Sequence, residues 1–307
     1  MDAGRLRLDL SFQGTWAEDR RVLRCPEFSP SVCADIDLPD HVRRSTFAAL
    51  RWQGTASIGL GKGFSIAASL PLVLKSFDVA HSRLDGSAYD VPYSLLSGVS
   101  GPIVGLGDAT VMARLSGRVP NTPLQLQVGL GAALPTGRTS PDPFDPSLPA
   151  SQRQPRQFGN GTVDPQVELG LVVGTRPFGF VAQGTTRIPL YANEHGYRGQ
   201  WTLGGSAGLL TTLPEPLRSL VLLLMVDASH TSPALWHGEA SENSGGDQIA
   251  LRLAFEWAAT DTFSLRGQLV ASPLQELEGE QFAAPISLGF GASGIIDLRP
   301  KAKRHGH

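Results

Sequence analysis

The sequence predicts an all-β fold, an antiparallel up-and-down β-barrel of twelve strands. Apolar and polar residues alternate with a period of two along most of the chain, as expected of strands that have one apolar and one polar face. The connections between these stretches alternate between long and short, which is typical of barrels whose turns gather at one end and whose loops gather at the other. The longest strongly apolar run, residues 220–226, is much shorter than the roughly 18 residues that a spanning helix needs.

Residues 123–135 show the alternation most clearly. Leu, Val or Ala occupies every even position from Leu124 to Leu134, while Gln125, Gln127 and three small residues occupy the odd positions. A helix would mix these two classes on every face. A tilted strand crosses a bilayer with roughly 9–11 residues, so we interpret this stretch as a membrane-crossing strand.

The composition is compatible with this interpretation. Hydrophobic residues make up 41% of the chain and the mean hydropathy is −0.05, because only half of each barrel strand needs to be apolar. The net charge of −2 gives no reason to expect a nucleic acid partner. We therefore predict a location in the outer membrane of a Gram-negative bacterium, with its lipids as partners. No secretory leader is visible before the first strand pattern, so this prediction expects that a leader has been removed.

The first expected strand shows how the two faces are assigned. Leu6, Leu8 and Leu10 lie on the outer face, and the alternate positions, which include Arg7 and Asp9, are all polar. Because buried charges are costly, such a polar face favours a wet lumen over a dry core. In chain order, the expected strands are residues 5–16, 46–60, 64–77, 107–117, 123–135, 163–173, 178–190, 199–210, 219–230, 247–257, 263–272 and 284–296.

Some elements follow from weaker signals. Pro71 lies inside the third expected strand, where a proline removes a donor from the ladder. The alternation is blurred in residues 219–230, so the inward placement of Asp227 is a choice of register. Residues 17–45 and 78–106 are expected to be long connections, and a glycine turn at 61–63 is expected to be tight. One barrel domain is expected over residues 1–298, followed by a basic tail at 299–307.

The inner faces carry charged residues that are candidates to line the lumen. Such charges could form a ring that selects solutes, or they could pair across the barrel and fill it. Both roles remain open at this point. The candidates are Arg7, Asp9, Arg51, Lys75, Asp108, Arg114, Glu168, Arg187, Asp227, Arg252, Glu256 and Arg266.

Two cysteines, Cys25 and Cys33, lie in the same polar segment. Their even number and shared loop favour a disulfide formed in an oxidising compartment. The alternative is two unrelated thiols. The carboxylates nearby are too few to suggest a metal site.

No constellation in the sequence points to catalysis, a metal or a cofactor. Ser229 and His230 are adjacent, so in a strand they face opposite sides. Glu239, Glu242 and Asp247 lack the spacing of a recognised calcium loop and are interpreted as a solvated acidic segment. We therefore expect a protein that is not an enzyme and has no cofactor.

Four short glycine-rich or acidic motifs occur in the first half of the chain: Gly105-Leu-Gly-Asp, Leu134-Pro-Thr-Gly, Phe158-Gly-Asn-Gly and Val163-Asp-Pro. By themselves they indicate strand ends and turns. In order and spacing the chain resembles, over residues 64–186, a family of bacterial outer-membrane barrels described as transporters or as meta-pathway phenol-degradation proteins. The resemblance implies an outer-membrane barrel that takes up small, in part aromatic, molecules, and it carries no catalytic residues.

The sequence therefore favours a porin-like channel or transporter for passive uptake of small solutes, some of them aromatic or hydrophobic. An alternative is a non-conducting structural or surface-interaction barrel that works through its long extracellular loops. An enzyme with its site in the lumen or at the rim is a third, less favoured interpretation. A soluble lipocalin-like barrel is disfavoured, because apolar side chains turned inward could not fill so wide a barrel. The oligomeric state is left open.

Overall fold

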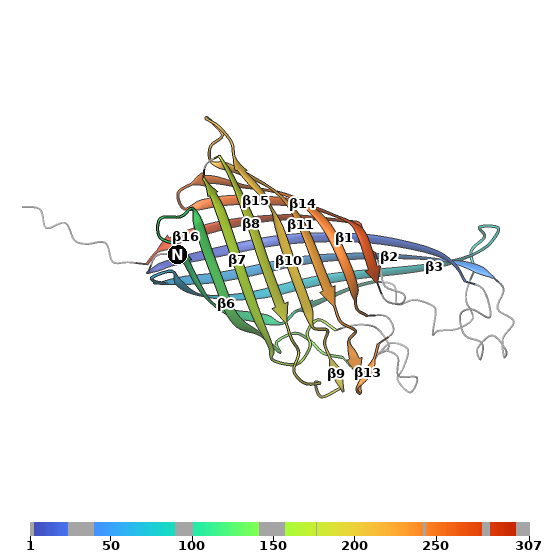
Figure 1. Cartoon of the computed structure of the whole chain (residues 1–307). Coiled ribbons are helices and arrows are strands. Elements are labelled where there is room, and N and C mark those ends of the chain that lie inside the picture. Colours follow the sequence, from blue (N-terminus) through green and yellow to red (C-terminus); the bar gives the residue numbers. More distant parts are fainter. Residues whose placement is uncertain are drawn as a thin grey trace, which may run out of the picture.

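The computed structural model describes residues 3–23, 40–89, 101–140, 157–175, 177–241, 244–277 and 283–298. These residues form a closed antiparallel barrel of twelve strands, as the sequence predicts (Figure 1). The barrel strands are β1 (Arg5–Leu23), β2 (His41–Gly61), β3 (Phe64–Arg83), β5 (Ala109–Arg118), β6 (Leu124–Leu134), β7 (Asp164–Thr175), β8 (Phe178–Arg187), β10 (Thr202–Thr212), β11 (Leu220–Thr231), β14 (Gly246–Thr260), β15 (Phe263–Leu277) and β16 (Ile286–Asp297).

Each barrel strand pairs with its neighbours along the chain, and β1 pairs with β16 to close the barrel. The pairing of β1 with β16 runs from Arg5 opposite Asp297 to Trp16 opposite Ile286. The β2–β3 turn is as tight as predicted, with Gly61, Lys62 and Gly63 at positive φ values of 98°, 51° and 79°. Glycine adopts such angles without the steric cost that other residues meet.

The outer face of the barrel is apolar and exposed. In β6, Leu126, Val128 and Leu130 are 44%, 45% and 60% exposed, whereas Gly129 and Ala133 on the inner face are buried. The same arrangement recurs around the barrel, with exposed leucines, valines and aromatic residues on most strands. Water-soluble proteins rarely expose so continuous an apolar band, so this surface is suited to lipid.

None of the described residues forms a helix that is long and apolar enough to cross a membrane.

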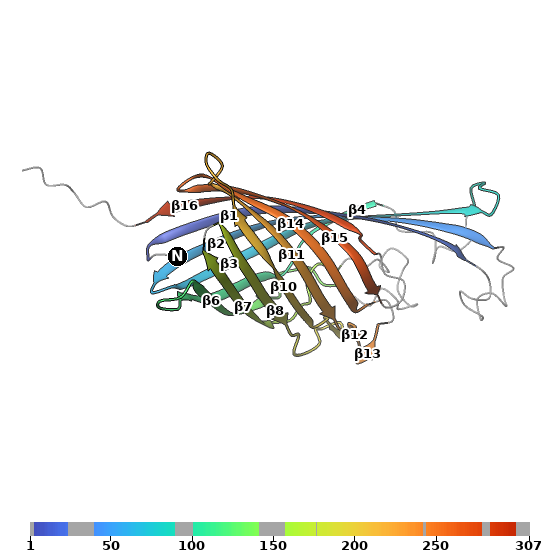
Figure 2. The same cartoon turned by 45° about the horizontal axis from the view of Figure 1, so that its top comes forward.

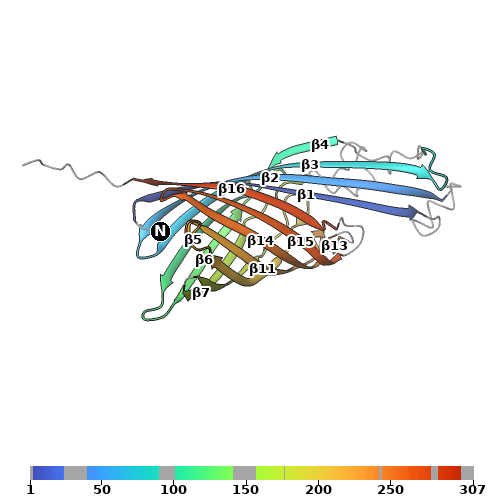
Figure 3. The same ribbon diagram turned by 90° about the horizontal axis from the view of Figure 1, so that it is seen from above.

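The first three strands are longer than the sequence predicted, and the expected connections 17–45 and 78–106 are therefore partly wrong. Among the described residues, β1 beyond Trp16 pairs with β2 alone. Beyond Phe77, β3 pairs with β2, and an isolated bridge joins Ser82 to Ala88. Residues 17–23, 41–47 and 78–83 thus form a projecting ribbon that extends past the rest of the barrel (Figure 3). The alternation fails there because charged residues, such as Arg20 and Arg44, replace apolar ones on the outer face.

A short strand, β4 (Gly101–Leu106), lies in the second expected connection. Strand β3 pairs with β5 over residues 64–69 and with β4 over residues 72–77. Pro71 lies at this change of partner, and its carbonyl accepts a hydrogen bond from the Gly107 amide (2.9 Å). The N–H and C=O of a strand residue point to the same neighbour, so the proline nitrogen faces the gap between β4 and β5. A proline is tolerated where the ladder is interrupted.

A second, small sheet of β9 (Tyr197–Arg198), β12 (Leu235–Trp236) and β13 (Glu239–Ala240) lies at the end of the barrel far from the N-terminus (Figure 2). The rings of Tyr197 and Trp236 pack there with centroids 4.7 Å apart. The predicted disulfide between Cys25 and Cys33 and the predicted basic tail at 299–307 lie outside the described residues.

Candidate functional site

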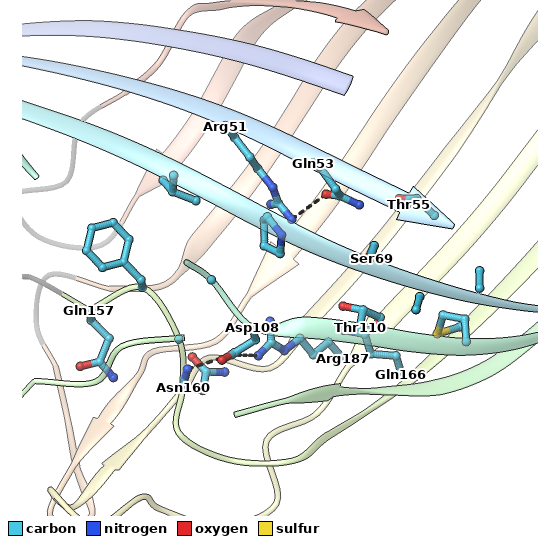
Figure 4. Close-up of a pocket in the computed structure, with 18 of the residues that line it drawn as sticks. Arg51, Gln53, Thr55, Ser69, Asp108, Thr110, Gln157, Asn160, Gln166 and Arg187 are labelled. Atoms are coloured by element: carbon cyan, nitrogen blue, oxygen red, sulfur yellow. Dashed lines mark hydrogen bonds and ion pairs between the residues drawn. The ribbon is translucent and has the colours of Figure 1, made fainter. Parts of the chain in front are cut away.

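The motifs of the first half of the chain meet on the inner face of the barrel. Asp108 precedes β5, Asp164 begins β7 and Arg187 ends β8. The Arg187 guanidinium donates through Nη2 to Asp108 Oδ2 (2.9 Å; Figure 4). Through Nε it donates to Asp164 Oδ2 (2.8 Å). We call these three residues the Arg187 cluster. The Asp164 side chain is fully buried, and buried charges persist only when they are paired and hydrogen-bonded.

Both carboxylates of the Arg187 cluster have further donors. Asp108 accepts hydrogen bonds from the backbone amides of Gly137 (3.2 Å) and Asn160 (2.9 Å). Asp164 accepts one from the Asn160 side chain (2.7 Å) and one from the Thr162 hydroxyl. Both oxygens of each carboxylate are therefore engaged in hydrogen bonds, as buried polar groups need to be.

The glycines of these motifs allow the segment 157–162 to pack closely inside the barrel. A Cβ on Gly105 would lie 2.5 Å from the Phe158 ring, and one on Gly159 would lie 2.2 Å from Asp108 Oδ1. A Cβ on Gly137 would lie 2.6 Å from the Gly159 Cα. The interpretation of these motifs as strand ends and turns is therefore incomplete, because they also hold this segment against the wall.

Beside the Arg187 cluster lies a cavity of about 540 Å³, which we call the basic cavity (Figure 4). Strands β2, β3 and β5, together with residues 157–160, supply most of its wall. Its charged lining residues are Arg51, Lys75, Asp108, Arg114, Glu168 and Arg187. All six are candidates that the sequence named for the lumen, whereas Asp164 was missed, although it shares the inward parity of Glu168.

Tyr197, from the small sheet, also lines the basic cavity. Burial raises the pKa of its phenol above the ordinary value. The phenol therefore stays neutral near pH 7 and adds no negative charge to the cavity.

Most of the other charged candidates pair with one another. Arg114 binds Glu168 through two hydrogen bonds (2.7 and 3.0 Å), and Arg252 binds Asp227 through two (3.0 and 2.9 Å). Asp9 lies 3.0 Å from Arg7 and 3.4 Å from Arg266. Within the described part of the chain, the candidates that form no ion pair are Arg51, Lys75 and Glu256.

Among the further cavities in the described part of the barrel, three have volumes of about 360, 480 and 530 Å³. Successive cavities share lining residues. Arg114 and Glu168 line both the basic cavity and the 360 Å³ cavity, and Gln183 lines the other three. Outside the ion pairs, the walls of the 360 and 480 Å³ cavities consist largely of glutamine, threonine, serine and glycine. The 530 Å³ cavity also has apolar lining residues, among them Phe12, Phe255 and Phe290.

The residues considered for catalysis are separated. Ser229 lines the 480 Å³ cavity, while the His230 ring packs on Trp201 (4.7 Å between centroids) and its Nδ1 lies 2.9 Å from Asp247 Oδ1. Among the described residues, no group of three or more His, Cys, Asp or Glu side chains could hold a metal ion.

The barrel is similar to solved structures of outer-membrane proteins. It matches the crystal structure of an outer membrane channel from Pseudomonas putida F1 over 96% of this chain and 97% of the other, with a TM-score of 0.60 and 13% sequence identity. At this identity the likeness shows a shared fold alone.

Two further solved structures are more distant. They are the NanC porin (TM-score 0.46, 8% identity, 92% of this chain and 98% of that chain) and the CymD monoaromatic hydrocarbon channel (TM-score 0.42, 10% identity, 96% of this chain and 89% of that chain). Neither is close enough to inform fold or function. No protein-family model matches the chain, and no curated protein matches it in sequence. The resemblance to the meta-pathway phenol-degradation family therefore stays a prediction.

Proposed function

We propose that this protein is an outer-membrane channel through which small solutes, including aromatic or hydrophobic ones, enter passively. The series of internal cavities with shared lining residues is the observation that supports this function best. The apolar outer face suits the barrel to a lipid bilayer, and the polar inner face suits it to a wet passage. The twelve charged candidates of the sequence are proposed to line this passage.

The charges of the proposed passage are arranged mainly in pairs. Paired charges, amides and hydroxyls offer hydrogen bonds to a solute without a strong net field. Such a wall suits uncharged and weakly charged solutes, and it makes strong ion selectivity along the whole passage unexpected.

A substitution that narrows the passage tests the proposal. Gln183 of β8 lines three of the four cavities, whereas the neighbouring Ala182 lies on the opposite face of the strand. We expect Gln183→Trp to lower the single-channel conductance in a planar bilayer about twofold or more, because the indole would occupy the lumen. Ala182→Trp, the matched control, would place the same ring in lipid and leave the conductance unchanged.

A barrel that folds but never conducts would contradict the proposal. Folding would be checked by comparing the gel migration of unheated and heated samples. A folded barrel migrates differently before and after it is denatured by heat. A silent, folded wild-type protein would favour the alternative of a surface-interaction barrel. The projecting ribbon is the observation that favours this alternative, because it lies beyond the wall that surrounds the cavities.

A further inference from the structure

The basic cavity contains two neighbouring cations, Arg51 of β2 and Lys75 of β3. Arg51 lies opposite Val73 in the β2–β3 register, and Lys75 is two residues further along on the same face. Long side chains in this diagonal relation can reach the same part of the lumen, and both residues line the basic cavity.

The partners of these two cations are all uncharged. Arg51 Nη2 donates to Gln53 Oε1 (2.9 Å), and Lys75 Nζ donates to the Gln157 carbonyl (3.0 Å). The Lys75 ammonium also lies 5.2 Å from the centroid of the Phe158 ring, a favourable cation–π contact. In the described part of the chain, neither cation meets a carboxylate, and most of their N–H donors are left for a ligand.

The acidic residues of the cavity are held by other groups. Glu168 is held by Arg114 through two hydrogen bonds. Asp108 accepts from two backbone amides and from Arg187, and its side chain is only 4% exposed. In Figure 4, Arg51 lies on one side of the cavity, and Asp108 and Arg187 lie on the other.

We propose that the basic cavity binds small organic carboxylates, with Arg51 and Lys75 holding the carboxylate oxygens. A guanidinium fork matches the two oxygens of a carboxylate, and a lysine ammonium adds a point charge beside it. Phe158, Pro71 and Val73 line the same cavity and offer an apolar surface to the body of the ligand. The volume of about 540 Å³ lies within the usual range of small-molecule sites. This inference rests on the proposed channel function, because the cavity lies on the proposed passage.

Binding can be measured without transport. The full-length protein, folded in detergent, would be titrated with 4-fluorobenzoate and followed by fluorine NMR line width. The probe 4-fluorobenzamide has the same shape and no charge. We expect the carboxylate to bind at least about tenfold more tightly than the amide, because hydrogen bonds between charged groups contribute more than neutral ones.

Charge-removing variants locate the site. Arg51→Gln and Lys75→Gln are each expected to weaken 4-fluorobenzoate binding about tenfold. Arg266→Gln removes a lumenal positive charge outside the basic cavity and leaves Asp9 paired with Arg7, so it should leave the affinity unchanged. Gel migration on heating would confirm that each variant folds.

Three results would overturn the inference: equal binding of the amide, unchanged affinity in both cavity variants, or displacement by inorganic phosphate at equal concentration. The last would mean that the apolar surface contributes nothing. These failures differ from failure of the channel function. A conducting barrel that binds no 4-fluorobenzoate contradicts only the site, whereas a silent barrel that binds it contradicts only the channel.

Discussion

Single residues in the lumen divide into those whose charge is satisfied by the protein and those whose charge is not. Asp164 has no exposed side-chain surface and accepts hydrogen bonds from Arg187, Asn160 and Thr162. Lys75 lines the basic cavity, and among the described residues its partners are a carbonyl and an aromatic ring. The first pattern is typical of a structural group, and the second of a group that awaits a ligand.

The structural role of Asp164 predicts a large loss of stability on substitution. In Asp164→Ala, the Arg187 guanidinium loses one of its two carboxylate partners. The Asn160 amide and the Thr162 hydroxyl lose the acceptor of their hydrogen bonds. Breaking a buried ion pair costs about 3–5 kcal/mol, and because Asp108 remains, we expect about 3 kcal/mol. The measurement is a urea titration of the protein in detergent, followed by gel migration.

The matched control for Asp164→Ala is Glu215→Gln. The Glu215–Arg218 pair is 2.8 Å long but its side chains are 66% and 71% exposed, so its loss should cost less than about 1 kcal/mol. Equal midpoints of urea unfolding for Asp164→Ala and Glu215→Gln would show that the Arg187 cluster is not a stabilising element.

The sequence predicted the inward charges from parity but not their grouping. Asp108 and Arg187 are 79 positions apart, and period-two patterns say which face a residue occupies, not which residues on that face meet. Asp164 was overlooked because it lies in a motif interpreted as a turn. Its signal was available, since it has the same parity as Glu168 on one strand.

The alternation of apolar and polar residues is clear only in strands that have one face in lipid. This explains which strands the sequence predicted correctly and which it did not. Barrel strands such as β6 were predicted to within a residue or two because one face must be apolar in lipid. The projecting ribbon carries no such requirement, so its charged residues gave no strand signal. Strand β4 was missed because six residues with glycine and proline at 101–106 show no alternation.

The ribbon is predicted to be less stable than the barrel wall. Among the described residues, 17–23 of β1 pair with β2 only, whereas residues 6–16 pair on both sides. We expect backbone amides in residues 17–23 and 78–83 to exchange with deuterium about tenfold faster or more than those in residues 6–12, because one-sided pairing opens more readily. Mass spectrometry of peptides from the labelled protein measures this difference. Uniform protection would indicate that another molecule covers the ribbon.

At the scale of the molecule, the barrel wall presents an apolar exterior and a polar interior, the reverse of a water-soluble barrel. This inversion was predictable from the sequence because it depends on parity alone. The size of the basic cavity was not, since it depends on residues 157–162 folding inward against Gly105 and Asp108.

A pair of arginine substitutions on one strand tests this inversion. Leu130 faces outward on β6 and is 60% exposed, whereas Gln127 lines an inner cavity. We expect Leu130→Arg to destabilise the barrel in lipid vesicles by about 2–4 kcal/mol, while Gln127→Arg stays within about 1 kcal/mol of the wild type. Denaturant titrations in vesicles provide the comparison, and a harmless Leu130→Arg would contradict the lipid-facing assignment.

The pairing of β1 with β16 has a consequence for the order of folding. Every other barrel contact joins strands that follow one another along the chain, so it can form soon after its hairpin does. The pairing of Arg5 with Asp297 instead closes a loop of nearly the whole chain, and its entropic cost grows with that length. The pairing of β1 with β16 is therefore expected to form last. Until it does, β1 and β16 are open edges on which a second chain could add, so slow closure would appear as aggregation rather than as a misfolded monomer.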